Sequence, residues 1–237
     1  HHTISDVALV GGGSNPKPGE ISLAHNGILF LDELPEYKRQ VLEVMRQPLE
    51  DRCVTISRAK MTVDYPAGFM LVASMNPSPS GNFFDPNDPN SDPEYVVKRY
   101  LNKISGPLMD RIDLHIEVPA VKFDELSSKV KGESSEQIRH RVLKARDIQE
   151  KRFDDYDGIY HNAQMTPKLL EQYCDIDDAG QTLLKLAMNK MGLSARSYAR
   201  ILKVSRTIAD LEASQHIKPN HIAEAIQYRS MDRNGMM

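Results

Sequence analysis

Cysteine and long apolar runs are both scarce in this sequence. The 237 residues include two cysteines, Cys53 and Cys174, which lie far apart and form no C-x-x-C pair. They provide neither a disulfide framework nor a metal knuckle, and they suit a reducing cytoplasm, where we expect the protein to be located. No apolar run approaches the ~20 residues of a membrane span, and no segment resembles a signal peptide. We therefore expect no membrane partner.

A large excess of charge of one sign is also absent. The 30 basic and 33 acidic side chains give a formal net charge of -3. This balance excludes a generally basic protein that coats nucleic acid, although it does not exclude local basic hairpins. The length allows one large or two modest domains with a proper core.

The phosphate-binding loop G-x-x-x-x-G-K-[ST] does not occur in these residues. The stretch Gly11-Gly12-Gly13 has no lysine in the required place and follows no convincing buried strand. We therefore interpret it as a flexible loop. A phosphate loop of this type would lie one strand and one helix before the acidic residues described next.

An apolar run near the start of the chain leads directly into two carboxylates. The residues Gly27-Ile28-Leu29-Phe30-Leu31 precede Asp32 and Glu33. Four apolar residues between a glycine and an acid predict a strand buried on both faces of a parallel sheet, with the acids at the carboxyl end where ligands of open α/β sheets bind. There Asp32 would hold a hydrated magnesium ion and Glu33 would polarise an attacking water. The alternative is a strand end without a catalytic role.

Further apolar runs continue the α/β pattern. Residues 69–75 form a second buried-strand candidate, which we expect to lie beside the first. Residues 52–57 and 61–64 are β-prone and flank Arg58-Ala59-Lys60, which predicts a hairpin with these three residues at its tip. Residues 114–118 are predicted to form a last strand of the sheet.

The second half of the chain is helical in character. Residues 134–152 carry apolar side chains at helical spacing among many charges, which predicts a long surface helix. Beyond residue 158 the pattern predicts helices that begin at Thr166-Pro167, run through 183–191 and 194–211, and begin again after Pro219. A small, all-helical domain is therefore expected to follow the sheet domain.

Four segments together resemble the AAA+ ATPases, and within them the magnesium chelatase-like group that includes bacterial competence-associated branch-migration helicases. The resemblance covers nearly the whole chain. Its most specific segments are Pro18–Gly27, Ala73–Pro77, Ile104–Asp113 and Gly192–Tyr198. It implies an α/β AAA+ core with a partial parallel sheet, flanking helices and an inserted β-hairpin, followed by a helical lid domain. The implied division is a core over 1–120, a connecting segment with a long helix over 121–160, and a lid over 161–237.

The resemblance implies roles for several polar residues. Asp32 and Glu33 match the Walker B pair, and Asn76 matches sensor 1, an amide that orients the attacking water. Without the neighbouring acids, Asn76 followed by Pro77 would indicate only a polar turn between a strand and a loop. Arg111 matches the arginine finger, which acts on the phosphate bound by a neighbouring subunit. The alternative for Arg111 is a surface ion pair with Asp110 or Asp113.

Three further features take their meaning from the resemblance. Arg196 matches sensor 2 at the start of a lid helix, and Arg200, one helical turn further on, is a second candidate for the same role. The alternative without a catalytic role is an exposed charge on the helix. The hairpin tip with Arg58 and Lys60 matches a channel loop that would contact DNA phosphates. The alternative is an edge hairpin protected by its lysine. The segment 5–13 corresponds to a second channel loop.

The implied cofactors are ATP and Mg²⁺, and the implied partners are other copies of the chain in a ring, expected to be a hexamer, and DNA. Relatives often carry closely spaced cysteines after sensor 1, whereas this chain has Asn76-Pro77-Ser78-Pro79-Ser80-Gly81. Serine hydroxyls are poor zinc ligands, so no zinc is predicted. Because the phosphate loop is lacking, the chain by itself is expected to hydrolyse ATP negligibly.

Several functions remain open at this stage. The leading hypothesis is a DNA-remodelling or branch-migrating ring ATPase. A chelatase motor that drives metal insertion through a partner protein is a second class. A transcription-activator ATPase would require a Gly-Ala-Phe-Thr-Gly-Ala loop, but the corresponding residues are Val7-Ala8-Leu9-Val10-Gly11-Gly12. A catalytically inactive binding module is a fourth hypothesis.

Overall fold

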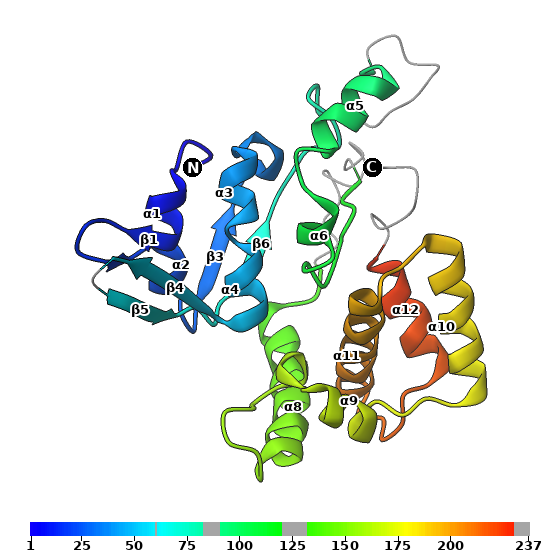
Figure 1. Cartoon of the computed structure of the whole chain (residues 1–237). Coiled ribbons are helices and arrows are strands. Elements are labelled where there is room, and N and C mark those ends of the chain that lie inside the picture. The colour runs from blue at the N-terminus through cyan, green and yellow to red at the C-terminus, as the bar shows by residue number, and fades with distance from the viewer. Residues whose placement is uncertain (60, 83–90, 120–131, 230–237) are drawn as a thin grey trace. The chain divides into compact units, whose positions relative to one another are not determined.

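The computed structural model describes residues 1–59, 61–82, 91–119 and 132–229 (Figure 1). The chain divides into two compact units, His1–Ile112 and Asp113–Asn234, apart from a few residues at the C-terminus. This boundary differs from the predicted domain limits at 120 and 160, which remain predictions. Lys60 lies outside the described residues.

The described residues of the first unit form short helices and three separate pairs of strands. Its elements are α1 (Asp6–Val10), β1 (Gly11–Gly12), β2 (Lys17–Pro18), α2 (Glu20–Leu23), β3 (Ile28–Leu31), η1 (Leu34–Glu36), α3 (Arg39–Glu43), α4 (Arg46–Asp51), β4 (Cys53–Arg58), β5 (Met61–Pro66), β6 (Met70–Ala73), α5 (Glu94–Leu101) and α6 (Gly106–Met109). Buried side chains from α1, α2, α3 and β4, including Leu9, Ile21, Leu42 and Ile56, form its core.

The predicted parallel pairing is present. Strand β3 pairs in parallel with β6, with Ile28 opposite Met70 and Leu31 opposite Ala73. The expectation of a strand buried on both faces is wrong, because Ile28 and Phe30 are 63% and 59% exposed. Alternate residues of a strand share one face, and in the described residues β3 pairs only with β6, so nothing there covers this apolar face.

The glycine-rich stretch is more ordered than expected. Gly11 and Gly12 form β1, which pairs antiparallel with Lys17–Pro18, so the interpretation as a flexible loop is wrong for these two residues. Gly11 has φ of 105°, and a Cβ atom there would lie 2.4 Å from the carbonyl oxygen of Lys17. Glycine is therefore required by a tight backbone contact and a positive φ angle.

The second unit contains helices α8 (Ser135–Phe153), α9 (Pro167–Tyr173), α10 (Asp178–Met191), α11 (Ala195–Leu211) and α12 (Pro219–Gln227), with the short η2 (Asn162–Gln164). The sequence located their starts well because capping residues precede them: the side chains of Thr166 and Ser194 accept hydrogen bonds from the third residue of α9 and α11. The predicted strand over 114–118 is wrong. Leu114, Ile116 and Val118 are exposed, and no strand pairs with them in the described residues.

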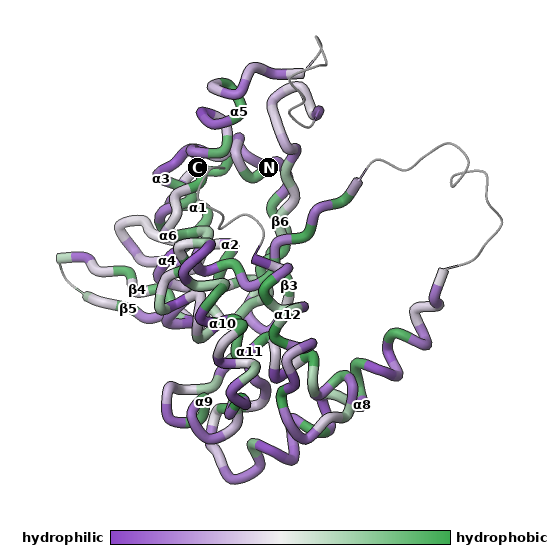
Figure 2. Tube along the Cα trace, turned by 90° about the vertical axis from the view of Figure 1, so that its right-hand side faces the viewer, coloured by the Kyte–Doolittle hydropathy of each residue, from purple (hydrophilic) through white to green (hydrophobic). Residues whose placement is uncertain are grey.

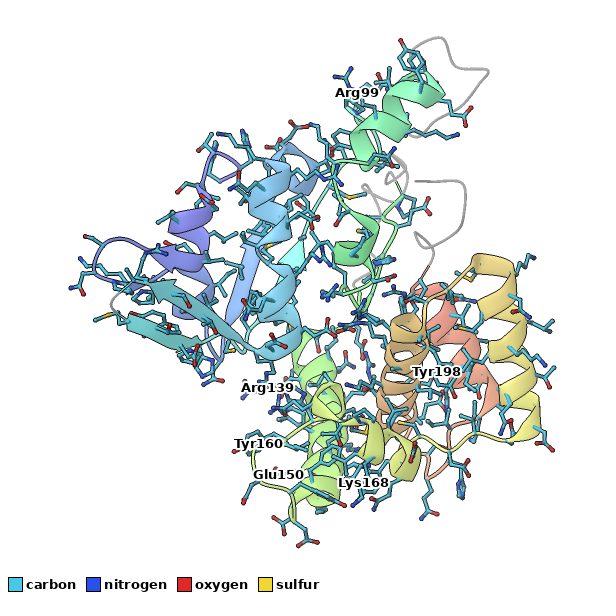
Figure 3. All side chains as sticks on the ribbon, in the orientation of Figure 1. Arg99, Arg139, Glu150, Tyr160, Lys168 and Tyr198 are labelled. Atoms are coloured by element: carbon cyan, nitrogen blue, oxygen red, sulfur yellow. The ribbon has the colours of Figure 1, made fainter. Side chains whose placement is uncertain are left out.

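Helix α8 shows the long amphipathic pattern expected from the sequence, with hydrophilic and hydrophobic residues alternating along it (Figure 2). Ala145, Gln149 and Phe153 are its buried residues, and they share one face of the helix. Arg139 and Glu150 are exposed (Figure 3). Only the C-terminal half of α8 therefore packs within the second unit.

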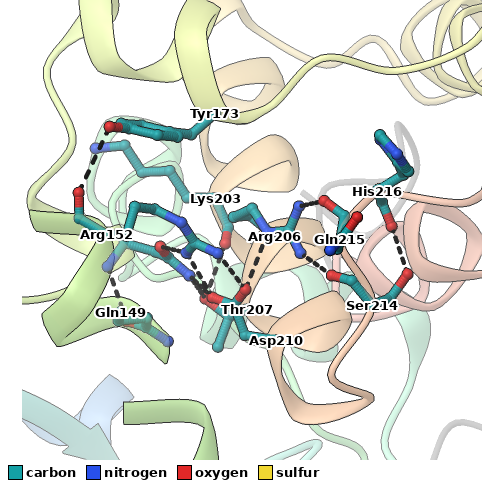
Figure 4. A network of polar contacts seen from close by, with 11 residues as sticks. Gln149, Arg152, Tyr173, Lys203, Arg206, Thr207, Asp210, Ser214, Gln215 and His216 are labelled. Atoms are coloured by element: carbon teal, nitrogen blue, oxygen red, sulfur yellow. Dashed lines mark hydrogen bonds and ion pairs between the residues drawn. The ribbon is translucent and has the colours of Figure 1, made fainter. Parts of the chain in front are cut away.

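A buried polar network joins α8 to α11 (Figure 4). The fully buried carboxylate of Asp210 accepts hydrogen bonds from Arg152 at 2.5 and 2.7 Å, from Arg206 at 3.1 Å and from Asn162 at 2.8 Å. Gln149 accepts a bond from the backbone N–H of Asn162 at 3.0 Å. These bonds compensate the loss of water around three charged groups, as a buried charge cluster requires.

Candidate active site

The candidate site begins where β3 and β6 end. Because Leu31 lies opposite Ala73, the next residues of the two strands, Asp32 and Ser74, are neighbours. The hydroxyl of Ser74 donates a hydrogen bond to Oδ1 of Asp32, and the backbone N–H of Glu33 donates to the same oxygen at 3.1 Å. The parallel pairing therefore fixes the orientation of the Asp32 carboxylate.

Glu33, the residue after Asp32, has an unusual backbone conformation. Its φ and ψ of 54° and 50° lie in the left-handed region, which costs a non-glycine residue on the order of 1 kcal/mol. The backbone N–H of Leu34 donates to the carbonyl of Ser74 at 2.9 Å, which holds the turn against β6. The half-exposed Glu33 carboxylate lies 3.2 Å from Nδ1 of His2. The turn therefore begins directly at the second acid of the pair.

Asn76 lies at the same end of the sheet, two residues after Ser74. It is exposed, and its backbone N–H donates to the hydroxyl of Tyr100. Asp32, Glu33 and Asn76 come from neighbouring strand ends, so the structure brings together the three predicted residues of the hydrolytic centre.

Two buried tyrosines adjoin this cluster. Burial raises the pKa of Tyr37, and the nearby carboxylates of Asp32 and Glu33 raise it further. Burial also raises the pKa of Tyr100, with contributions from Glu36 and Glu33, while the hydrogen bond from Asn76 lowers it. Reasoning from the sequence missed both tyrosines and Ser74. The pairing of β3 with β6 brings Ser74 to Asp32, whereas Tyr37 follows η1 and Tyr100 lies on α5.

The donor set fits a hydrated Mg²⁺ ion, which binds proteins through one or two carboxylates and keeps several waters. Asp32 and Glu33 are both exposed, and both add to the raised pKa of Tyr37, so their negative charges act on one small region. Asp32 would hold such an ion through water. The ion would neutralise phosphate charge at this edge of the sheet.

Arg111 has a different environment from that predicted. Its side chain is only 8% exposed, and its guanidinium lies 2.6 Å from Oε2 of Glu50 and donates to the carbonyl of Pro107 at 2.7 Å. Arg111 therefore pairs with Glu50 of α4, whereas the alternative for this residue proposed Asp110 or Asp113. Nε of Arg111 is buried without a partner among the described residues.

The two lid arginines both lie on α11, in the second unit. Arg196 is exposed, whereas Arg200 forms an ion pair with Asp113. The choice between them as sensor 2 remains a prediction.

The predicted hairpin is present. Strands β4 and β5 pair antiparallel from Cys53 opposite Pro66 to Arg58 opposite Met61. The exposed Arg58 donates from Nε to the carbonyl of Gly13 at 3.0 Å. The bond connects the end of the hairpin to the glycine-rich turn, which places the two predicted channel segments side by side.

The segment after Asn76 is held by serines and an aspartate. The backbone N–H of Ser80 donates to Asp92 at 2.8 Å, and this bond is the main cause of the lowered pKa of Asp92. In the described part of the chain, no group of three or more His, Cys, Asp or Glu side chains could hold a metal ion. Nor is any described helix both long and apolar enough to cross a membrane.

Comparisons with known proteins agree with this geometry. The family described as "Magnesium chelatase, subunit ChlI" matches residues 1–126, and "Magnesium chelatase, subunit ChlI C-terminal" matches residues 132–229. The competence protein ComM of Haemophilus influenzae is 51% identical over 98% of this chain and 45% of its own length. The uncharacterized protein YifB of Escherichia coli is 44% identical over the same shares.

A more distant relative is the magnesium-chelatase subunit ChlI of Pyropia yezoensis, which is 26% identical over 53% of this chain and 29% of its own length. The chain spans less than half the length of ComM and YifB. On the strength of these matches, the chain belongs to the magnesium chelatase-like family of AAA+ ATPases, in the group that contains ComM and YifB.

Proposed function

We propose that the protein is an ATPase motor that works as a ring, expected to be a hexamer, and remodels or branch-migrates DNA. The observation that carries this proposal is the convergence of Asp32, Glu33 and Asn76 at the ends of the parallel strands β3 and β6. An ordered acid, a second acid next to it and an amide at one sheet edge are the groups that water-mediated phosphoryl transfer needs.

Each residue has a distinct part in the proposed mechanism. Asp32, oriented by Ser74, would hold a hydrated Mg²⁺ ion, which would supply positive charge beside the phosphates. Glu33 accepts a proton from the attacking water as general base, and Asn76 orients that water through its amide. Arg111 stabilises negative charge in the site of a neighbouring subunit, so it has to exchange its contact with Glu50 for the phosphate. Arg196 or Arg200 supplies a further cation from α11.

Two observations favour DNA over other substrates. Arg58 lies at the end of strand β4, and Lys60 follows two residues later in the sequence. Cations repeated around a ring would contact a phosphate backbone. The 51% identity to a protein named for competence extends over 98% of the chain, whereas the 26% identity to the chelatase subunit covers 53%.

The chain without a phosphate loop is still expected to hydrolyse ATP negligibly by itself.

A chelatase-type motor is the second candidate, favoured by the two family descriptions that match the chain. The decisive experiment measures ATP hydrolysis by the full-length protein with branched DNA, with linear duplex, and with a porphyrin plus magnesium and the partner subunit of a chelatase. The proposal predicts stimulation by branched DNA. Stimulation by the porphyrin mixture alone would replace the DNA function with the chelatase function.

A further inference from the structure

An open cavity of about 610 Å³ lies in the first unit, beside α5. It is lined by Arg39 of α3, by three residues of α5 and by the two residues that follow α5. These residues are Tyr95, Lys98, Arg99, Asn102 and Lys103. Four of the six lining side chains are cationic, which is unusual in a chain with a net charge of -3.

Nearby acids neutralise only half of this positive charge. Lys98 pairs with Glu94 at 2.7 Å and Lys103 with Glu36 at 3.3 Å, and both pairs are exposed enough to exchange easily with another anion. Arg39 and Arg99 are exposed, and neither forms a hydrogen bond or ion pair in the part of the chain that the structure describes. Glu43 is the other acid close enough to interact with Arg39.

An aromatic ring completes the lining. Tyr95, on the same helix as Arg99, is 73% exposed, so its ring is accessible to a ligand. Asn102 adds an amide that both donates and accepts hydrogen bonds. Free guanidinium groups beside an exposed ring are the two components with which proteins hold nucleic acid strands without sequence preference.

We propose that this cavity binds a segment of single-stranded nucleic acid, in which Arg39 and Arg99 contact phosphates and Tyr95 stacks on a base. The assignment rests on the proposed function, since it takes DNA as the substrate class, and it adds a contact separate from the hairpin. A free nucleotide offers the same phosphate and base chemistry. The experiment therefore has to distinguish a strand from a nucleotide.

The test measures binding of a fluorescent single-stranded oligonucleotide to the full-length protein by anisotropy at several salt concentrations. The double variant Arg39→Ala/Arg99→Ala should weaken binding on the order of tenfold and reduce the logarithmic salt slope by about 1.4, since each single-strand phosphate contact contributes about 0.7. Tyr95→Ala should weaken binding about tenfold with an unchanged slope, and Tyr95→Phe should restore it, because stacking needs the ring alone.

The matched control is Lys168→Ala/Lys185→Ala, which removes the same charge from exposed positions of the second unit. Melting curves of all variants should match the parent, because the side chains changed are exposed. If the cavity variant behaves like this control while Arg58→Ala/Lys60→Ala weakens DNA binding, the cavity assignment is wrong and the DNA function stands.

Two further outcomes are informative. If the parent protein binds no DNA of any kind, the proposed function and the cavity assignment both fail. If Arg39→Ala/Arg99→Ala loses affinity for ATP but keeps its affinity for the oligonucleotide, the cavity holds a free nucleotide and the strand assignment is overturned.

Discussion

Replacing Asp210 by asparagine should strongly destabilise the second unit. The Asp210 side chain is fully buried and bridges Arg152 and Arg206, whose side chains are 12% and 4% exposed. Burial lowers the pKa of Arg206, and the carboxylate of Asp210 opposes that shift by stabilising the charged guanidinium. Asparagine keeps the shape of the side chain but removes this charge.

The size of the effect follows from what the substitution leaves behind. Breaking a buried ion pair by removing one partner costs about 3–5 kcal/mol, because an uncompensated charge stays buried. The hydrogen bonds that Asp210 accepts from charged groups would each contribute about 1.5–3 kcal/mol alone, but they share one carboxylate and do not add. We therefore expect the free energy of unfolding of the second unit to fall by about 3–5 kcal/mol.

Hydrogen exchange measures this stability locally, through the amides of α8 and α11. The control is Asp147→Asn, which removes an exposed charge that pairs with Lys151 at 2.9 Å and should cost less than about 0.5 kcal/mol. The reasoning fails if Asp210→Asn leaves the opening free energy of these helices within about 1 kcal/mol of the parent.

Further predictions concern the interface, the hairpin and a thiol. Mixing Arg111→Ala subunits with Glu33→Gln subunits should restore part of the ATP hydrolysis, because some interfaces then combine an intact Arg111 with an intact Glu33. Co-assembly of the two variants without any recovery would contradict an arginine finger that acts between subunits. Changing Arg58 and Lys60 together to Ala should weaken duplex DNA binding and reduce its logarithmic salt slope by about two units, with basal hydrolysis largely spared; an unchanged slope in a variant that still forms rings would favour an edge-protecting hairpin. The Cys174 thiol should resist alkylation at pH 8 until the protein unfolds, because burial raises its pKa to about 12 and leaves almost no thiolate at pH 8. Rapid labelling of the native protein, read by mass spectrometry, would be incompatible with that burial.

Local signals predicted much of the architecture. The hairpin strands Cys53–Arg58 and Met61–Pro66 followed from β-prone runs around a short tip, and α9 and α11 began at the expected caps. These features depend on residues close together in the sequence. Capping, alternation and turn composition are physical properties of short segments, so they are readable without knowledge of the fold.

Features that depend on distant partners could not be predicted in this way. The apolar run 114–118 has the composition of a strand, but no described strand pairs with it. Arg111 was predicted to act on the phosphate of a neighbouring subunit, with a surface pair to Asp110 or Asp113 as the alternative, and its contact with Glu50 of α4 was not foreseen. Ser74 has no motif of its own, and it joins the candidate site only because β3 and β6 pair in a particular register.

The central claim is that hydrolysis at Glu33 drives work on DNA. Its most direct test follows the conversion of a synthetic four-way junction by the full-length protein, with ATP or a non-hydrolysable analogue, for the parent and for Glu33→Gln. The account predicts conversion only by the parent with ATP, while the variant still binds both ATP and the junction, since an amide cannot act as general base. Undiminished conversion by Glu33→Gln would contradict the account.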